Sequence, residues 1–259
     1  MAKTKVICFA NNKGGSGKST TCSNVGYGLS VLGSKVLLID GDMQMNLSLS
    51  LFDEDQVLSY AQSGKNLYEG IRRQDDLTDY IVHSRYEGLD LIPSSTLMSS
   101  IEYELFTKWQ REYILRKCLA NIVESEMYDY ILIDAPPTLG GWVMNILCAS
   151  NKIVIPVEST PWGLFGLEFL EQVRQIAPEL ELGGLVITKV DTRKSYFKQT
   201  LETLKELEDV RVFDTYIRVD SGIEWSQDNH TPIMAYKKSS RSAAEYMELA
   251  KEIAQIAGV

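Results

Sequence analysis

The segment nearest the N-terminus has the residue types of a phosphate-binding loop. Residues 6–20 read VICFANNKGGSGKST, which is an apolar run, a turn with three glycines and the start of a helical pattern. Backbone N–H groups at a helix N-terminus converge on an anion, and the helix dipole favours its negative charge. Glycines let the backbone approach a phosphate closely because they carry no Cβ. The segment therefore predicts a site for the phosphates of a nucleotide.

Two side chains at the end of this loop are suited to complete such a site. Lys18 is placed to reach the β- and γ-phosphates, and Ser19 to ligate magnesium through its hydroxyl. The alternative is a plain glycine turn with a solvated lysine, which the strand and helix patterns on either side disfavour. We expect ATP and Mg²⁺ to bind at the loop formed by Lys13, Gly14, Gly15, Ser16, Gly17, Lys18, Ser19 and Thr20.

One departure from the general GxxxxGK[ST] pattern is informative. Asn12 stands where the first glycine belongs, and a second lysine, Lys13, precedes the glycines. This form resembles the deviant Walker A motif of the ParA/MinD family of ATPases. The resemblance implies that Lys13 reaches across a nucleotide-sandwich homodimer to the ATP of the partner subunit. An ordinary solvated loop lysine is the alternative.

Two aspartates follow the next apolar run, in LLIDGDMQMN. Asp40 and Asp42 lie one residue apart at the expected C-terminal end of a strand, where open α/β sheets bind ligands. The resemblance implies that Asp42 positions the attacking water and that Asp40 lies in the outer shell of the magnesium. The family usually has Asp-Pro-Gln-Gly-Asn here, and this chain has Met43 and Met45 in place of the proline and glycine. The path of this loop therefore does not follow from the resemblance.

A third carboxylate ends the run YDYILIDAPP, which has the form of a Walker B strand. Asp134 suits a magnesium site, because this cation keeps several waters and takes few protein ligands. A helix cap is the alternative role for Asp134. The resemblance also implies three residues near the adenine base: Thr188 and Asp191 in VITKVDTR, and Pro232 in NHTPI.

The elements that must position these residues alternate along the chain. Near-continuous apolar runs, typical of parallel strands covered on both faces, occupy residues 6–10, 35–39, 89–93, 130–133, 152–157 and 184–188. Helical patterns occupy residues 19–32, 142–149, 166–177, 196–207 and 243–256. This alternation predicts an α/β fold, a three-layer sandwich with a mostly parallel twisted sheet of the P-loop NTPase type. No linker divides the chain, so we expect a single ATPase domain over residues 1–259; residues 52–86 show no clear pattern.

Composition restricts the class of protein. The chain of 259 residues is 44% hydrophobic and 24% charged, as in ordinary globular proteins, and it has no apolar run long enough to span a membrane. Four scattered cysteines form no CxxC pair, which favours free thiols and a cytoplasmic location. A net charge of -9 argues against a surface that coats nucleic acid as a whole, though it leaves room for a local basic patch.

The C-terminal segment helps to decide which branch of the family the chain resembles. AEYMELAKEIAQIAGV places Glu245, Glu248 and Glu252 on the polar face of a helix, whereas the membrane helix of MinD proteins is basic. We therefore expect no membrane partner and a helix packed on the sheet. The cysteine spacing does not match iron–sulfur relatives either. What remains resembles the small ParA/Soj partition ATPases, which begin at their first strand as this chain does.

The resemblance implies an Mg-dependent ATPase that acts in plasmid or chromosome segregation. The ATP-bound homodimer would hold nonspecific double-stranded DNA, and a ParB-like centromere-binding protein would stimulate hydrolysis and release, which makes the protein nucleoid-associated. A positioning ATPase for a protein cargo and a metabolic P-loop enzyme such as an amidoligase are the alternatives. Basic residues of the C-terminal half are the candidate DNA contacts, each with a solvated surface cation as the alternative: Arg193, Lys194, Lys198, Arg218, Lys237, Lys238 and Arg241. Asp220 and Glu224 lie among them and weaken the expected affinity.

Overall fold

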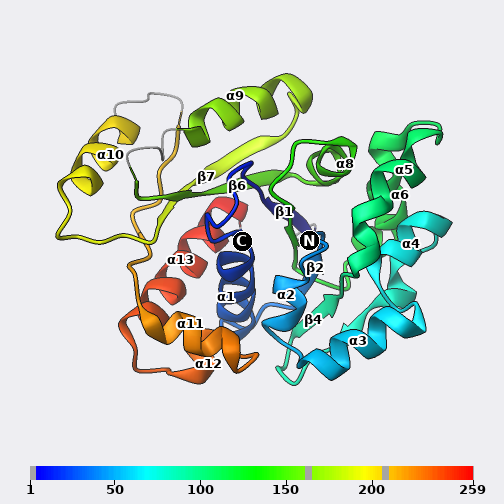
Figure 1. Ribbon diagram of the computed structural model, residues 1–259, viewed down its shortest axis with the longest axis horizontal. Helices are drawn as coiled ribbons and strands as arrows, with labels where there is room; N and C mark the ends of the chain where they lie inside the picture. Colours follow the sequence, from blue (N-terminus) through cyan, green and yellow to red (C-terminus); the bar gives the residue numbers. More distant parts are fainter. Residues whose placement is uncertain (1–3, 161–164, 206–209, 259) are drawn as a thin grey trace.

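The computed structural model describes residues 4–160, 165–205 and 210–258 (Figure 1). Its centre is a seven-stranded sheet in the order β3-β4-β2-β5-β1-β6-β7, parallel except where β3 pairs with β4. The strands are β1 (Lys5–Phe9), β2 (Val36–Asp40), β3 (Val82–His83), β4 (Leu89–Ile92), β5 (Tyr130–Asp134), β6 (Lys152–Glu158) and β7 (Glu181–Thr188). The predicted α/β fold with a mostly parallel sheet is confirmed.

The central strands are buried on both faces, which explains their continuous apolar sequences. Every residue of β2 and β5 is buried, including the aspartate at the C-terminal end of each strand. In the register, Asp40 lies beside Asp134, and Phe9 of β1 lies on the other side of Asp134. The sheet therefore gathers the predicted carboxylates at the edge where the glycine loop leaves β1 (Figure 1).

Helices cover both faces of the sheet. One apolar layer contains residues of α1, α2, α3, α12 and α13, and the other contains residues of α4–α10. The helices of the first layer, together with the neighbouring α11, are α1 (Lys18–Val31), α2 (Asn46–Leu49), α3 (Glu54–Ser63), α11 (Ser221–Asp228), α12 (Ile233–Tyr236) and α13 (Arg241–Ala257). Those of the second are α4 (Leu67–Arg73), α5 (Ile101–Phe106), α6 (Ile114–Cys118), α7 (Ala120–Glu124), α8 (Gly141–Ala149), α9 (Phe165–Ile176) and α10 (Ser195–Lys205). Residues 206–207, the predicted end of the α10 pattern, lie outside the described residues.

The C-terminal helix packs as expected. Tyr246, Leu249, Ala250 and Ile253 of α13 are buried in the layer that includes α1. The two helices lie so close that a Cβ added at Gly28 of α1 would come within 2.7 Å of the Ala250 Cβ. The apolar stripe of α13 is therefore buried inside the fold.

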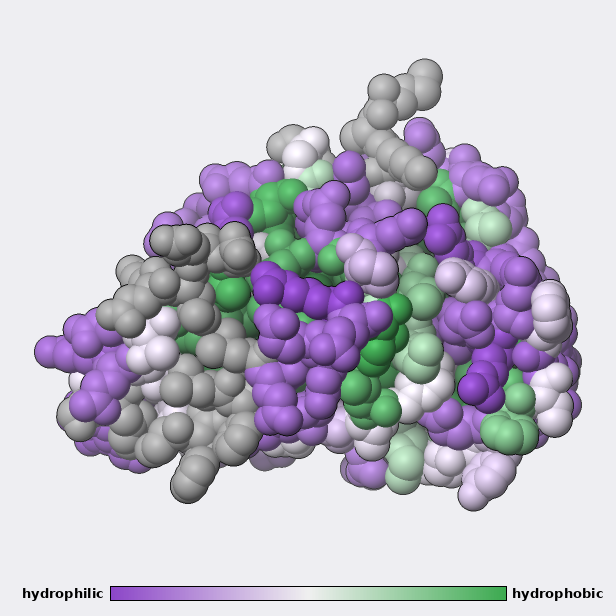
Figure 2. All heavy atoms as spheres, turned by 90° about the horizontal axis from the view of Figure 1, so that it is seen from above, coloured by the Kyte–Doolittle hydropathy of each residue, from purple (hydrophilic) through white to green (hydrophobic). Residues whose placement is uncertain are grey.

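The segment with no clear pattern folds into short elements. Asp53 caps α3 through a capping box with Gln56, and Asn66 caps α4. The 3-10 helices η1 (Leu77–Tyr80), η2 (Thr96–Ser100) and η3 (Arg111–Tyr113) follow between the longer elements. On the face shown in Figure 2, hydrophilic side chains predominate and hydrophobic ones come to the surface in patches. Within the described residues, no helix is both long and apolar enough to cross a membrane.

Candidate functional site

The glycine loop runs from the end of β1 to the start of α1. Gly15 and Gly17 have φ angles of 73° and 87°, in the left-handed region that favours glycine. Gly17 is the N-cap of α1 and makes no side-chain cap, so the first N–H groups of the helix have no capping side chain. This leaves the helix N-terminus open to an anion, as the sequence predicts.

Two side-chain hydrogen bonds hold the loop against strands β6 and β7. Asn11 donates from Nδ2 to the carbonyl oxygen of Pro156 at 2.7 Å and accepts at Oδ1 from the Lys13 N–H at 3.0 Å. Thr188, at the end of β7, donates from Oγ1 to the carbonyl oxygen of Ser16 at 2.8 Å. Sequence reasoning missed Asn11, and it placed Thr188 near the base, whereas here Thr188 supports the loop and lines the same cavity.

The two lysine side chains of the loop lie in different environments. Lys18 is 6% exposed, and its Nζ donates to the Lys13 carbonyl oxygen at 3.3 Å. Burial lowers the pKa of Lys18, while the Asp134 and Asp42 carboxylates oppose that shift. Lys13 instead forms an ion pair with Glu158, Nζ to Oε2 at 2.7 Å. Lys13 does not line the cavity that contains Lys18.

Asp40 organises the loop that follows β2. Its Oδ2 accepts from the N–H and the hydroxyl of Ser48 at 2.8 and 2.6 Å, and its Oδ1 accepts from the Asp42 N–H at 3.2 Å. Burial raises the pKa of Asp40 to about 6, against these hydrogen bonds. Ser48, which the sequence analysis did not identify, thus ties Asp40 to α2. Asp42 is 6% exposed, and its Oδ1 accepts from the Gln44 N–H at 3.1 Å.

Asp134 has the environment of a cation ligand. The residue is fully buried, and neither carboxylate oxygen has a hydrogen-bond partner among the described residues. Burial, and then the neighbouring Asp40 carboxylate, raise the pKa of Asp134 well above its ordinary range. Ser19, the second residue of α1, and Lys18 lie close enough to Asp134 to oppose that rise. A buried carboxylate whose charge is only partly balanced in this way fits a nearby cation. Asp134 does not cap a helix, because the N-cap of α8 is Gly140.

No group of three or more His, Cys, Asp or Glu side chains that could hold a metal ion by itself occurs within the described ranges. In proteins, magnesium is usually bound by one or two carboxylates, and nucleotide phosphates and waters supply the remaining ligands.

A cavity of about 590 Å³ opens in front of the loop. Its volume suits a nucleotide-sized ligand. Asp42 and Thr188 line it, and so do six of the predicted loop residues: Gly14, Gly15, Gly17, Lys18, Ser19 and Thr20. Sequence reasoning missed Ile217, Val219, Ile223 and Gln227, which form the wall from β7 to α11. Asp191 and Pro232 do not line this cavity.

One helix joins the segments that carry Asp40, Asp42 and Asp134. At the start of α8, the Gly141 and Trp142 N–H groups donate to the Glu102 carboxylate at 3.0 and 2.9 Å. Trp142 also donates from Nε1 to the Gly41 carbonyl oxygen at 2.9 Å. A Cβ at Gly41 would lie 2.7 Å from the Asp134 carbonyl oxygen, so only glycine fits between the two carboxylate segments. The N-terminus of α8 is therefore in contact with the segment that carries Asp40 and Asp42, which in turn packs against Asp134.

The predicted DNA contacts divide into paired and unpaired cations. Arg193 pairs with Asp191 at 2.8 Å and holds the pKa of that carboxyl low, at about 2. Arg218 and Arg241 both pair with Glu245, which is 10% exposed. Lys198, Lys237 and Lys238 are exposed, and no ion pair with another described residue is formed by them. Lys194 lines a second cavity beside Arg193.

Comparison with known proteins places this site in a family. A family model described as "AAA domain" matches residues 4–182. The sporulation initiation inhibitor protein Soj of Bacillus subtilis is 34% identical over 255 residues, which covers 96% of this chain and 98% of Soj. The chain belongs to the ParA/Soj family of P-loop ATPases.

Two further likenesses bear on function. The chromosome partitioning protein ParA of Caulobacter vibrioides is 32% identical over 254 residues, which covers 96% of this chain and 93% of that protein. Cobyrinic acid a,c-diamide synthase of Mycobacterium smegmatis, solved with a bound ATP analog and magnesium, matches with a TM-score of 0.76 and 27% identity over 96% of this chain and 93% of that chain. A member of the same fold therefore binds nucleotide and magnesium.

Proposed function

We propose that the protein is an ATP-dependent partition ATPase whose ATP-bound homodimer holds nonspecific double-stranded DNA. The observation that carries the proposal is the separation of the two loop lysines: Lys18 is buried against the phosphate loop, and Lys13 lies outside the cavity on Glu158. A lysine that does not serve its own pocket is free to serve the pocket of a second subunit. The name of one relative, the chromosome partitioning protein ParA of Caulobacter vibrioides, supports the same conclusion.

Each residue of the site then has a distinct task. The open N-terminus of α1 and Lys18 bind the triphosphate, and Lys13 of the other subunit adds positive charge to the transferring phosphoryl group. Ser19 and Asp134 would hold magnesium, with Asp40 behind them, and the metal supplies charge neutralisation at the phosphates. Asp42 orients the attacking water. Hydrolysis to ADP and phosphate is slow until a ParB-like centromere-binding partner stimulates it and the dimer releases DNA.

The DNA contact rests on cations that are not neutralised inside the protein. Lys198, Lys237 and Lys238 are the first candidates, because Arg193, Arg218 and Arg241 already face carboxylates. A dimer doubles a small patch, so a few phosphates are neutralised and the binding is weak, salt-sensitive and independent of sequence. Such binding makes the protein a nucleoid-associated cytoplasmic ATPase.

The test is retention of DNA measured with ATP, ADP and no nucleotide across a series of salt concentrations. We expect retention only with ATP, a linear fall of log affinity with log salt, and a dimer trapped by Asp42→Ala. Lys237→Ala with Lys238→Ala should flatten the salt dependence, and Lys251→Ala, in which the lysine pairs with Glu248 at 2.7 Å, is the matched control. ATP turnover that requires a small-molecule acceptor and ignores DNA would instead support the amidoligase alternative, which the likeness to cobyrinic acid a,c-diamide synthase favours.

A further inference from the structure

The segment that follows β7 lies along the glycine loop. It reads TKVD, residues 188–191, and Thr188 donates to the Ser16 carbonyl oxygen of the loop. Lys189 has a φ angle of 52°, a left-handed conformation that residues other than glycine seldom adopt. Its Nζ lies 3.8 Å from the place that a Cβ on Gly15 would occupy. Backbone strain of this kind concentrates at ligand sites, so Lys189 is a candidate for contact with a bound nucleotide.

Two cavities meet at Lys189. The nucleotide cavity in front of the glycine loop shares Lys189, Arg218 and Val219 with a second cavity of about 580 Å³. Asp191 lines this second cavity, two residues beyond Lys189. Lys189 forms no ion pair with another residue of the described ranges, so its side chain is available to a ligand in either cavity. A nucleotide with its phosphates at the glycine loop can therefore extend its base past Lys189 toward Asp191.

The Asp191 carboxylate is bound by two neighbouring N–H donors. Arg193 donates from Nε to Oδ1 and from Nη2 to Oδ2, both at 2.8 Å. The Arg193 side chain is 87% exposed, and an exposed ion pair of this kind is weak enough for a ligand to replace. The hydrogen bonds from Arg193 hold the pKa of Asp191 low, at about 2, so at neutral pH this carboxylate is ionised and only accepts hydrogen bonds. A base that displaces Arg193 must therefore present two N–H donors side by side.

Guanine presents such an edge and adenine does not. Guanine carries N1–H and N2–H2 next to each other, whereas adenine carries the N6–H2 donor next to N1, which has a lone pair and no hydrogen. Guanine would pair both oxygens of Asp191. With adenine, one oxygen would face the N1 lone pair and stay unpaired, which costs binding free energy. Sites that hydrogen-bond a donor of one ligand reject a ligand that lacks it by large factors.

We propose that the nucleotide site also binds guanine nucleotides, in competition with ATP, with N1–H and N2–H2 of the base on Asp191 in the place of Arg193 and the Lys189 side chain along the base. Arg193 then determines the specificity, because the carboxylate tolerates adenine only while Arg193 neutralises it. The proposal rests on the proposed nucleotide site at the glycine loop, but not on partition or on DNA binding.

The test is calorimetry of the full-length protein with Mg²⁺ and the diphosphates of adenosine, guanosine, inosine and xanthosine. GDP should bind with a Kd within about tenfold of that for ADP, since both share the contacts of the diphosphate, and saturating GDP should abolish the binding of ADP. Inosine diphosphate, which lacks the N2 group, should bind about tenfold more weakly than GDP, because it leaves one oxygen of Asp191 without a donor.

Two variants separate a contact with the base from a general effect on the cavity. Asp191→Asn offers one donor and one acceptor, which suits xanthine, in which an oxygen replaces the N2 group of guanine. This variant should bind GDP at least about tenfold more weakly and xanthosine diphosphate about tenfold more tightly, without binding ADP more tightly; Asp55→Asn, the same change at an exposed position of α3, is its control. Arg193→Ala should bind GDP several-fold more tightly and ADP no more tightly, and Lys251→Ala, which removes an exposed ion pair with Glu248, is the control.

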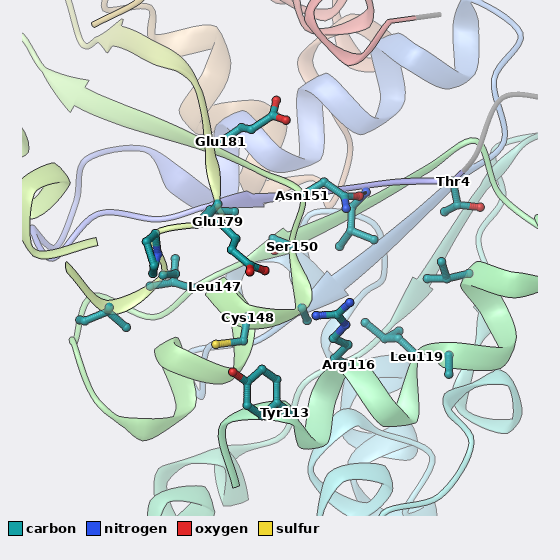
Figure 3. Close-up of a pocket in the computed structure, with 18 of the residues that line it drawn as sticks. Thr4, Tyr113, Arg116, Leu119, Leu147, Cys148, Ser150, Asn151, Glu179 and Glu181 are labelled. Carbon is teal, nitrogen blue, oxygen red and sulfur yellow. Dashed lines mark hydrogen bonds between the residues drawn. The ribbon is translucent and has the colours of Figure 1, made fainter. Parts of the chain in front are cut away.

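A groove of about 800 Å³ at the opposite edge of the sheet, where the strands begin, is another location that the experiment must distinguish. Figure 3 shows Arg116 and Glu179 among the side chains that line it. No residue of the glycine loop lines this groove, so GDP bound there would leave ADP binding intact and would lose affinity in Glu179→Gln. We expect the opposite on both counts. GDP that binds together with ADP, or that responds to Glu179→Gln, would place the base outside the nucleotide site and overturn the proposal.

The remaining outcomes separate this proposal from the proposed function. Binding of ADP without binding of GDP would overturn the guanine assignment and leave the ATPase assignment standing. Binding of neither nucleotide would refute the nucleotide site itself, and this proposal with it. An unchanged preference for GDP over xanthosine diphosphate in Asp191→Asn would also overturn the proposal, because the base would then make no contact with that carboxylate.

Discussion

Glu158 keeps Lys13 inside its own subunit, and removal of this carboxylate gives a quantitative test of the sandwich dimer. The Lys13 and Glu158 side chains are 35% and 24% exposed, so their ion pair at 2.7 Å is partly screened by water. Pairs of this kind contribute about 0.2–1 kcal/mol. If both subunits lose the pair when Lys13 crosses to the partner, dimerisation costs about 0.4–2 kcal/mol that Glu158→Gln would remove.

The expected result is an ATP-dependent dimer whose Kd is about 2- to 30-fold lower in Glu158→Gln than in the wild type. The assay is analytical ultracentrifugation with a slowly hydrolysed ATP analogue, with Glu248→Gln as the control because Glu248 also pairs with a lysine at 2.7 Å. In a double-mutant cycle, Lys13→Gln should abolish the gain. A weaker dimer in Glu158→Gln would refute the reasoning, because it would mean that Glu158 supports Lys13 in the dimer rather than in the monomer.

Three further predictions concern the site and the core. Lys18→Ala should abolish ATP binding in calorimetry, since Lys18 is the buried cation of the loop; unchanged affinity would contradict the phosphate site. Folded Asp40 titrates near pH 6, above its ordinary value of 3.8, so the folded state binds more protons than the unfolded state between these values. The free energy of unfolding should therefore fall as pH rises from about 4 to about 6, and in urea titrations Asp40→Asn should reduce that fall by up to about 3 kcal/mol, whereas the exposed Asp55→Asn should not. Leu249→Ala in α13 should lower the free energy of unfolding by about 2–5 kcal/mol, and a loss below about 1 kcal/mol would mean that α13 is not part of the core.

The strands and the long helices could be predicted because their physical causes are local. Continuous apolar runs mark strands that are buried on both faces. For most ends of the predicted strands and helices, the predicted and observed limits differ by one residue, and three residues were missed at the start of β7. The short helices of residues 54–124 could not be read in the same way. The α-helices among them contain five to ten residues each, which is too few turns for a periodic pattern, and their caps, such as Asp53 and Asn66, resemble ordinary turn residues.

The residues of the site likewise fall into those that the sequence motifs predict and those that only the fold brings together. The glycine loop, Asp40, Asp42 and Asp134 form contiguous motifs, so their types and order along the chain were enough to predict them. Their supporting partners act only through the fold: Glu158 meets Lys13 across 145 residues, and Glu102 meets Gly141 across 39. The sequence around such residues carries no chemical signal that distinguishes them from other polar residues.

The bond from Thr188 to Ser16 gives nucleotide binding a dependence on nearly complete folding. Its two residues are separated by 172 positions, and Thr188 lies on the edge strand β7. Contacts between such distant residues close a large loop and therefore form late in folding. A chain that ends before β7 is completed lacks this support for the loop, even though it contains every residue of the glycine motif. Since a ligand stabilises the state that binds it, ATP should also strengthen the contact between the glycine loop and β7 and protect β7 from local opening.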